Sequence, residues 1–400
     1  MRIVVTDGNE RAALAITRSL GRVGHCVTVC SSKPKSLAGA SRHAYEDEQL
    51  PDPLQDPEAF RAALEGMCHS RSAEVLLPVT DASLEATLPY RERFRPTRIP
   101  FPSAERYRAI SDKQQVMERA RALGIPTPAQ ASLLEPTPPE ERTPLPQFPL
   151  VIKPSRSVIE DAEGKRKVGV SHVIDGHDLE AALELYSREA YPLLLQEYIP
   201  GSGEGGFFLR HEGQLVAQFA HRRIREKPPS GGISVYREAI PLASDVAEHS
   251  AALLEDFDWE GVAMVEFRRS SRDGRPYLME VNARFWGSLQ LALDAGVDFP
   301  RILVELDSGY PSEPVQSYRT GVRSRWWLGD LDHLLLRLRD GSDATGLPPG
   351  SPGHIGAVLR FLVPWRPGDR SEVLRWSDPG PGLREFAQWI DQLAHGRARP

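Results

Sequence analysis

Residues 261–298 hold the feature that most restricts how this chain can fold. VAMVEF (262–267) and YLMEVN (277–282) are apolar runs of strand length, and Asp273-Gly274 between them is a strong hairpin-turn signal. We therefore expect two antiparallel strands. Because side chains alternate between the faces of a strand, Glu280 and Asn282 share a face, and the hairpin can bring Glu266 beside Glu280.

This arrangement of side chains favours a metal site. Carboxylate and amide oxygens are ligands that suit Mg²⁺, and buried acids are rarely tolerated without a partner. Arg284 follows on the same side and can hold a phosphate or carboxylate in fork geometry. Taken alone, Glu266 is better explained as a solvent-facing acid, and Glu280 as a salt-bridge partner of Arg268 or Arg269. Their combination in one hairpin favours the metal.

The N-terminal sequence predicts a parallel α/β unit. A short strand at 2–6, a helix at 10–24 and a strand at 25–32 follow one another. Only Gly8 stands where a dinucleotide fingerprint needs three glycines, so we expect Rossmann-like topology without NAD. A further strand at 74–81 ends in Asp81, which either faces a ligand at the strand end or begins a helix.

Two lysines occupy positions that favour an anionic partner. A capping box with Ser111 as N-cap and Gln114 three residues later puts Lys113 in a first helical turn, where the helix dipole disfavours cations. Lys153 lies inside the apolar strand expected at 148–155. The alternatives are a solvated Lys113 paired with a neighbouring acid and a Lys153 paired with a nearby glutamate. We expect residues 155–170 to form a polar loop.

The glycines at 201, 203 and 206 match G-x-G-x-x-G but are followed by a strand pattern with a turn at Glu212-Gly213. No helix follows them, so we reject a dinucleotide site there. Residues 221–232 concentrate positive charge, including Arg222 and Arg223. They form either a solvated charge run or an anion-binding loop.

Composition excludes several classes of protein. A length of 400 residues predicts two or three domains at roughly 150 residues each. The net charge of −6 argues against a nucleic-acid binder, and no apolar run is long enough to cross a membrane. Three cysteines without a C-x-x-C motif fit a reducing cytosol, so we expect a cytoplasmic protein.

Taken in order, these parts resemble the ATP-grasp superfamily, and especially its carboxylate–amine ligases. The parts are a lysine at a helix start, a lysine in a strand, a polar loop, a strand ending in Gln-Glu-Tyr-Ile (196–199), and a hairpin with Glu and Glu-x-Asn-x-Arg. The resemblance covers about residues 1–305. It implies an α/β and α+β fold, with a Rossmann-like pre-ATP-grasp domain at 1–110 and an ATP-grasp domain at 111–305 whose lid lies at about 125–195. Residues 306–400 carry no pattern that we can assign.

The resemblance also implies roles for individual residues. Lys113 and Lys153 would contact the phosphates of ATP, while Glu197, Tyr198 and Ile199 would lie beside adenine. Glu204 would hold the ribose. Mg²⁺ (or Mn²⁺) would be bound by Glu266, Glu280 and Asn282. The catalytic groups would be Arg284, Lys153 and Arg223 (or Arg222 in its place). One departure is the loop at 155–170, which is poorer in glycine than the family's phosphate loop.

The implied activity is an ATP-dependent ligase that converts a small carboxylate, with an amino acid as the expected class, into an acyl phosphate for attack by an amine. ADP and phosphate are released. An ATP-grasp kinase or carboxylase, or a nucleotide-binding module without catalysis, are the alternatives. The expected partners are small molecules and a second copy of the chain, with no nucleic acid and no membrane.

Overall fold

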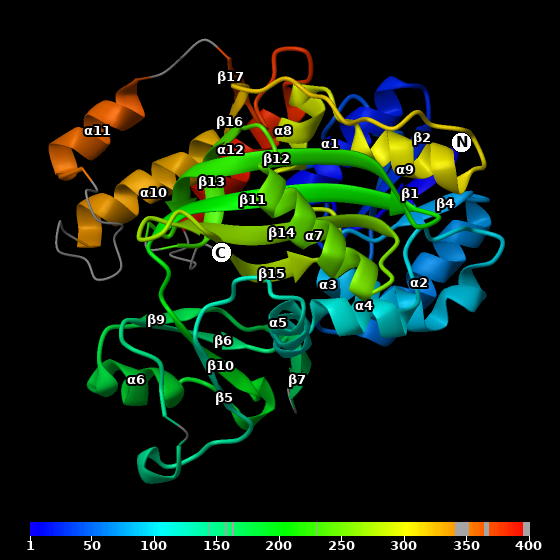
Figure 1. The fold of residues 1–400 in the computed structure, drawn as a ribbon. Helices are drawn as coiled ribbons and strands as arrows, with labels where there is room; N and C mark the ends of the chain where they lie inside the picture. The colour runs from blue at the N-terminus through cyan, green and yellow to red at the C-terminus, as the bar shows by residue number, and fades with distance from the viewer. Residues whose placement is uncertain are drawn as a thin grey trace.

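The computed structural model describes residues 1–142, 144–156, 158–161, 164–229, 231–340, 352–363 and 368–394. These residues form a parallel sheet, a small antiparallel sheet, a large seven-stranded sheet and a separate hairpin (Figure 1). Within the described ranges, no helix combines the length and the apolar character that crossing a membrane requires.

The N-terminal sheet is fully parallel. Its order is β3 (Glu46–Gln49), β2 (Cys26–Ser31), β1 (Arg2–Val5) and β4 (Val75–Leu77). The connecting helices are α1 (Arg11–Arg22) and α2 (Pro57–Ser70). This confirms the expected unit of strand, helix and parallel strand. β4 is shorter than the predicted 74–81 strand, because Thr80 caps the next helix and Asp81 begins it, α3 (Asp81–Thr87). The 3₁₀ segment η1 (Leu88–Phe94) follows.

Helices α4 (Ala104–Ser111) and α5 (Lys113–Ala122) lead to the small sheet. The N-cap of α5 is Asp112 and not the predicted Ser111, because the Asp112 carboxylate accepts from the backbone N–H groups of Gln114 and Gln115, at 3.0 and 3.2 Å. Ser111 instead ends α4. Lys113 therefore occupies the first position of α5, as expected.

The small sheet has its own apolar core and stands apart from the main body (Figure 1). Its order is β5 (Gln130–Leu133), β10 (Leu193–Glu197), β6 (Leu150–Pro154) and β9 (Ser171–Val173), with η2 (Pro139–Glu141), α6 (Gly176–Leu183) and η3 (Arg188–Ala190) in the connections. The segment expected as a polar loop contains a hairpin, β7 (Val158–Asp161) and β8 (Gly164–Lys167).

The seven-stranded sheet forms the centre of the molecule. Its order is β15 (Pro276–Asn282), β14 (Gly261–Ser270), β11 (Gly201–His211), β12 (Gln214–Lys227), β13 (Ile233–Ala239), β16 (Arg323–Arg325) and β17 (Asp369–Ser371). The turn at Glu212-Gly213 is confirmed, with both residues at positive φ. The expectation of a positively charged loop at 221–232 is wrong for its first part, since residues 221–227 form the end of β12. Helices α7 (Ser244–Asp256), α8 (Leu289–Ala295) and α9 (Phe299–Asp307) accompany this sheet.

The C-terminal region supplies β16, β17 and three helices: α10 (Trp327–Asp340), α11 (His354–Leu362) and α12 (Gly380–Ala394). Two of its strands extend the sheet of the preceding unit. We therefore propose that residues 306–400 are an extension of the 111–305 unit, and we keep 1–110 as a separate unit in that proposal.

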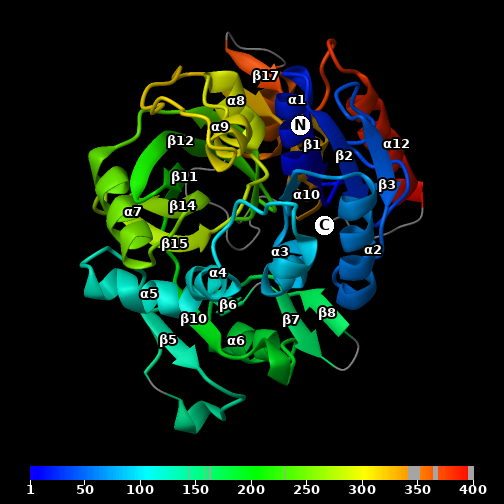
Figure 2. The same ribbon diagram turned by 90° about the vertical axis from the view of Figure 1, so that its right-hand side faces the viewer.

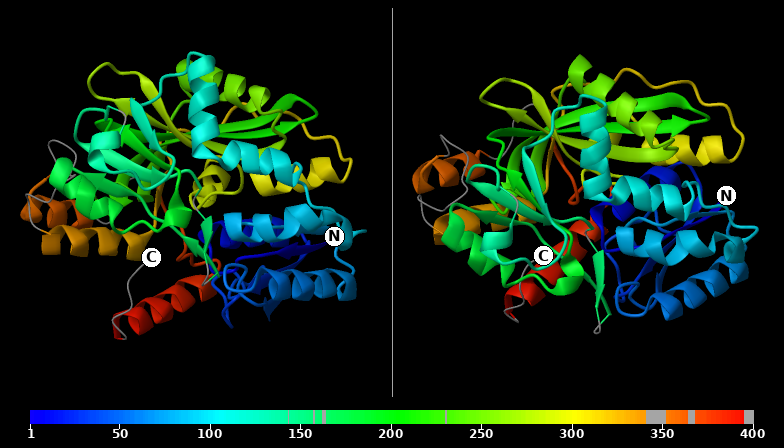
Figure 3. Two further views of the ribbon diagram at one scale, coloured as in Figure 1. Left: turned by 90° about the horizontal axis from the view of Figure 1, so that it is seen from below. Right: turned by 60° about the horizontal axis from the view of Figure 1, so that its bottom comes forward.

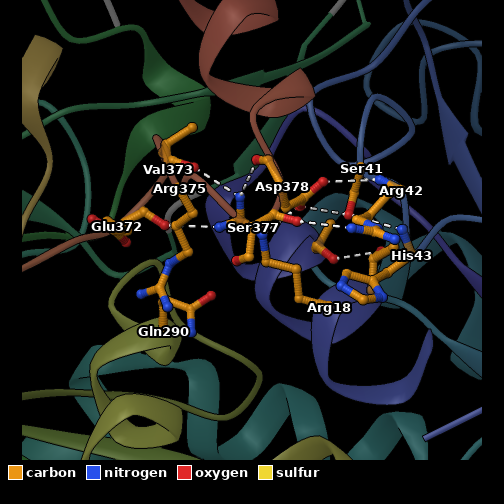
Figure 4. A network of polar contacts seen from close by, with 12 residues as sticks. Arg18, Ser41, Arg42, His43, Gln290, Glu372, Val373, Arg375, Ser377 and Asp378 are labelled. Carbon is orange, nitrogen blue, oxygen red and sulfur yellow. Dashed lines mark hydrogen bonds and ion pairs between the residues drawn. The ribbon is translucent and has the colours of Figure 1, made fainter. Parts of the chain in front are cut away.

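A buried ionic network joins the C-terminal region to α1. Arg18 is 1% exposed and donates to the Asp378 carboxylate at 2.8 Å and to the backbone carbonyls of Glu372 and Val373 at 2.9 and 2.7 Å (Figure 4). Asp378 also accepts from the Ser41 hydroxyl at 2.7 Å. A buried guanidinium is tolerated only when it is paired and hydrogen-bonded in this way. α12 consequently lies beside the N-terminal sheet (Figures 2 and 3).

Glu385 on α12 makes the stability of this junction depend on pH. Burial raises the pKa of its carboxyl to about 7, although Trp326 Nε1 donates a hydrogen bond to it. The folded state therefore binds the proton more tightly than the unfolded state. The contribution of this group is present below pH 4.5 and is lost as pH rises towards 7.

We predict that Glu385→Gln removes this dependence, because the amide oxygen still accepts from Trp326 but does not ionise. At pH 8 the free energy of unfolding of the variant should exceed that of the wild type by about 3 kcal/mol, and the difference should vanish near pH 4. Urea unfolding over this pH range measures it. An equal difference at every pH would contradict the prediction.

Candidate active site

A cleft lies between the small sheet and the central sheet and contains a cavity of about 380 Å³. Strands of both sheets line it, so side chains far apart in the sequence meet there. Most of the residues named from the sequence line this one cavity: Lys153, Glu197, Tyr198, Ile199, Arg223, Glu266, Glu280, Asn282 and Arg284. Lys113 lines an adjoining cavity of about 550 Å³, which shares Glu280 and Asn282 with the first.

The two glutamates at the centre of the cleft are direct cross-strand partners. Glu266 on β14 pairs with Glu280 on β15, as the predicted hairpin required. On the other side of β14, Glu266 pairs with Gly205, which in turn pairs with His221 on β12. Directly opposed residues point to the same face of a sheet. These side chains therefore form one row across the wall of the cleft.

Glycines on β11 leave room for this row. A Cβ atom on Gly205 would lie 3.2 Å from His221 Nε2 and 2.8 Å from a ring carbon of Phe207. One on Gly203 would lie 2.8 Å from Arg223 Cδ. The glycine-rich motif rejected as a dinucleotide site thus serves another purpose. It lets the side chains of β12 lie flat across β11 towards Glu266.

Positive charges surround the paired glutamates. Arg223 forms an ion pair with Glu266, and Lys113 Nζ lies 3.6 Å from Glu280. Burial raises the pKa of Glu266 despite the Arg223 charge. Burial also acts to raise the pKa of Glu280, but the charges of Lys113 and Lys153 outweigh it and the net shift is downward. Glu280 is therefore the carboxylate that the lysines keep ionised.

Lys153 is half-buried on β6, and its desolvation there lowers its pKa. Its backbone lies opposite Leu194 of β10, and Glu280 and Glu266 are the charges that oppose the shift. The arginines suggested as alternative partners of Glu280 pair with other acids. Arg269 pairs with Glu204 at 2.9 Å, and Arg268, which also lines the cavity, approaches Glu226 at 3.6 Å.

The start of α5 places Lys113 in the adjoining cavity, whereas Lys153 lines the first one, and Glu280 lines both. The Ser155 hydroxyl, just after β6, donates to the Asp112 carboxylate at 2.8 Å. The Lys113 backbone N–H donates to the Ser155 carbonyl at 3.0 Å. The start of α5 is thereby tied by two hydrogen bonds to the residue that follows the strand carrying Lys153.

Asp81 and Asn282 orient Arg284. The Arg284 Nε atom donates to Asp81 at 2.9 Å and its Nη2 atom donates to Asn282 Oδ1 at 3.1 Å. Burial alone would raise the pKa of Asp81, but the Arg284 charge and hydrogen bonds from Arg284 and Tyr107 lower it to about 2. Asp81 thus begins α3, as one alternative expected, and also fixes the direction of an arginine in the cleft.

The structure contradicts the expectation for Glu204. Its side chain lies on the other face of the sheet, where it pairs with Arg269, and that arginine also contacts Asp245 of α7 at 2.9 Å. The same alternation separates the two candidate arginines. Arg222 pairs with Glu238 away from the cleft, whereas Arg223 lines it. The faces of Glu204 and of the two arginines follow from the alternation of side chains, when positions are counted in steps of two from the residues paired with Glu266.

The segment expected beside adenine has part of its backbone already engaged. The Tyr198 N–H donates to the Pro149 carbonyl at 3.0 Å, and the Glu197 N–H donates to the Ala129 carbonyl at 2.8 Å. Of its two backbone groups, Tyr198 can therefore offer a purine only the carbonyl oxygen. The Glu197 carboxylate forms an ion pair with Arg272.

Sequence reasoning missed the inner end of the cleft. Arg11, His221, Arg237 and Trp286 line it, and they come from α1, β12, β13 and the loop after β15. No local pattern connects these four positions. His221 belongs to the positively charged run at 221–232, for which an anion-binding role was one alternative. A signal was also available for Arg11, which occupies the first position of α1, where the helix dipole disfavours a cation.

The residues present fit a Mg²⁺ ion that is shared with a phosphate. In the part of the chain that the structure describes, no three His, Cys, Asp or Glu side chains lie close enough to hold a metal. Glu266, Glu280 and the Asn282 amide supply a few oxygen ligands on one face. Mg²⁺ is commonly held by one or two carboxylates together with substrate phosphates, so this small set is sufficient.

Comparison with known proteins agrees with this geometry. Residues 189–328 match the family model described as "ATP-grasp in the biosynthetic pathway with Ter operon". A search of curated proteins found no match. An L-amino acid ligase from Bacillus licheniformis superimposes with a TM-score of 0.60 at 18% identity, covering 78% of this chain and 75% of that one.

Two further solved structures have the same fold. N5-carboxyaminoimidazole synthetase from Staphylococcus aureus, complexed with ADP, gives a TM-score of 0.61 at 14% identity, covering 80% of each chain. The biotin carboxylase domain of 2-oxoglutarate carboxylase from Hydrogenobacter thermophilus gives 0.60 at 15% identity, covering 80% of this chain and 73% of that one. Residues 189–328 therefore carry an ATP-grasp family match, and the chain shares the fold of these solved structures, with a cleft between two sheets.

Proposed function

We propose that this protein is an ATP-dependent ligase that activates a small carboxylate, with an amino acid as the expected class, for attack by an amine. The observation that carries the proposal is the set of half-buried charges around one cleft, where Glu266 and Glu280 lie between two lysines and two arginines. The likeness to an L-amino acid ligase supports the C–N bond-forming reaction. The neighbours solved with ADP and with MgADP support the nucleotide and the ion.

The chemistry requires activation because a carboxylate is a poor electrophile. An oxygen of the substrate carboxylate attacks the γ-phosphorus of ATP, forming an acyl phosphate while ADP leaves. The amine then attacks the acyl carbon, phosphate leaves with the electron pair of the broken C–O bond, and the amine loses a proton. Such transfer depends on positioning and on charge stabilisation more than on a protein nucleophile.

Four cations have a role in this scheme. Lys153 and Lys113 neutralise the triphosphate. Arg284, held by Asp81, and Arg223 stabilise the transferring phosphoryl group. Mg²⁺ held by Glu266, Glu280 and Asn282 would neutralise charge on the β- and γ-phosphates. Because the pKa of Glu280 is lowered, its carboxylate is ionised and ready to take part at neutral pH.

A carboxylase is the second candidate, because biotin carboxylase folds are among the structural neighbours. It differs in using bicarbonate as the acceptor of the phosphoryl group. The acceptor therefore separates the two functions.

The first prediction concerns the products. ADP and phosphate should be released only when a carboxylate and an amine are both present, and an amide should form in equal amount. A phosphate-release screen of amino acids against amines, followed by mass spectrometry, measures this. AMP as the nucleotide product would contradict the acyl-phosphate scheme, and dependence on bicarbonate would favour the carboxylase.

The second prediction concerns the metal ligands. Glu280→Gln should weaken Mg²⁺-dependent ATP binding by roughly tenfold or more and reduce turnover further, because one ionised ligand is lost. Glu204→Gln is the matched control, since it changes the same type of residue on the opposite face of the same sheet. Calorimetry with a non-hydrolysable ATP analogue, with and without Mg²⁺, measures the effect. Equal losses in the two variants would refute the assignment.

The third prediction uses the two adjacent arginines of β12. Arg223→Lys should lower kcat by roughly a hundredfold, because an ammonium does not reproduce the fork geometry of a guanidinium. Arg222→Lys, one residue away on the opposite face, should keep kcat within about twofold of the wild type, because surface ion pairs contribute little. Steady-state kinetics of both variants measure the contrast, and a similar kcat for the two would contradict the role of Arg223.

A further inference from the structure

The inner end of the cleft contains buried polar groups that the proposed reaction does not use. His221 is 1% exposed, Arg237 0% and Trp286 2%. Both ring nitrogens of His221, the Arg237 Nε atom and the Trp286 Nε1 atom have no hydrogen-bond partner among the described residues. All three side chains line the cavity. Buried polar groups are nearly always paired, so their concentration here indicates a ligand-binding site.

The charges at this end are positive in sum. Arg237 and Arg11 share one anion, Glu372, whose Oε2 atom lies 2.8 Å from Arg11 Nη1. Arg237 is also the direct cross-strand partner of Arg223, although like charges in that position repel. Glu385 is a further acid whose charge interacts with that of Arg11. Burial raises its pKa to about 7, so it is only partly ionised at neutral pH.

The shape of the site suits an anion. Gly287 lies under Arg11, and a Cβ atom there would come within 3.1 Å of Arg11 Nη2. Trp286 packs on Phe207, with ring centroids 4.5 Å apart, and Phe207 packs on His221 at 4.7 Å. The aromatic stack holds the indole and the imidazole in fixed positions. The free groups include two obligate donors, the Arg237 and Trp286 N–H groups, which match the oxygens of a carboxylate.

We propose that this inner site binds a second carboxylate of the substrate, so that the acid activated by this enzyme is a dicarboxylate. This rests on the proposed function, in which the first carboxylate reacts beside Arg223 and Arg284. Arg11, Arg237 and Trp286 bind the second, and Glu372 acts as a positioning residue that keeps the two arginines together. The C-terminal region, which carries Glu372 on the segment after β17, thereby completes the substrate site.

The test measures binding, so it does not depend on turnover. Glutarate, its monoamide glutaramate and butyrate are titrated calorimetrically into the full chain with ADP and Mg²⁺. Glutarate should bind at least about tenfold more tightly than glutaramate or butyrate, because only its second carboxylate is charged at the inner site. Equal affinity for glutarate and glutaramate would overturn the inference.

Two variants locate the effect. Trp286→Phe keeps the aromatic packing and removes one hydrogen-bond donor. Arg11→Gln removes the positive charge and leaves a neutral side chain at the start of α1. Each should weaken glutarate binding by roughly tenfold and leave butyrate binding unchanged. Trp259→Phe is the matched control, because Trp259 is also fully buried with an unpartnered Nε1 atom but does not line the cleft.

The variants also separate this inference from the proposed function. Equal losses of glutarate affinity in Trp286→Phe and Trp259→Phe would overturn the inner site even if amide synthesis is found. Tight glutarate binding that is lost only in Trp286→Phe and Arg11→Gln would support the inner site even if no amide is formed.

Discussion

The placement of two carboxylates, Glu266 and Glu280, directly opposite each other on neighbouring strands is the constraint on which the rest of the site depends. Buried like charges repel and are costly to desolvate, so such a pair persists only where cations or a metal offset the repulsion. The chain supplies those cations from three directions. Arg223 comes along the central sheet, Lys153 from the small sheet across the cleft, and Lys113 from the start of α5. The cleft exists where these elements converge, and the same charges that stabilise the glutamates are those that a triphosphate requires.

The central sheet separates its charges by face. Along β12, Arg222 pairs with Glu238 on one face while Arg223 points into the cleft on the other. The glycines of β11 matter for the same reason, because side chains at Gly203 and Gly205 would collide with those of β12. The G-x-G-x-x-G motif at 201–206, whose spacing resembles that of a phosphate-binding loop, is therefore part of the strand that lies beneath the site. Function here comes from strand alternation and pairing rather than from a loop.

Local patterns predicted much of the fold and the centre of the site. The hairpin that brings Glu266 and Glu280 together follows from two apolar runs and an Asp-Gly turn, which are all close in sequence. The hairpin at 158–167 was missed because its polar sequence shows no apolar alternation. Glu204 was misplaced because its face depends on pairing with β14, which lies 60 or more residues away. The pairing of Arg11 with Glu372 joins residues 361 positions apart, and no sequence period reports such a contact.

The central claim is that ATP activates the substrate carboxylate by phosphoryl transfer beside Arg223 and Arg284. The most direct measurement follows a heavy-oxygen label from the substrate carboxylate into the products by mass spectrometry. Formation of an acyl phosphate requires one labelled oxygen to leave with inorganic phosphate when the amine attacks, and the amide keeps the other. The account predicts one labelled oxygen in each phosphate released. Unlabelled phosphate, or label carried into AMP, would contradict it.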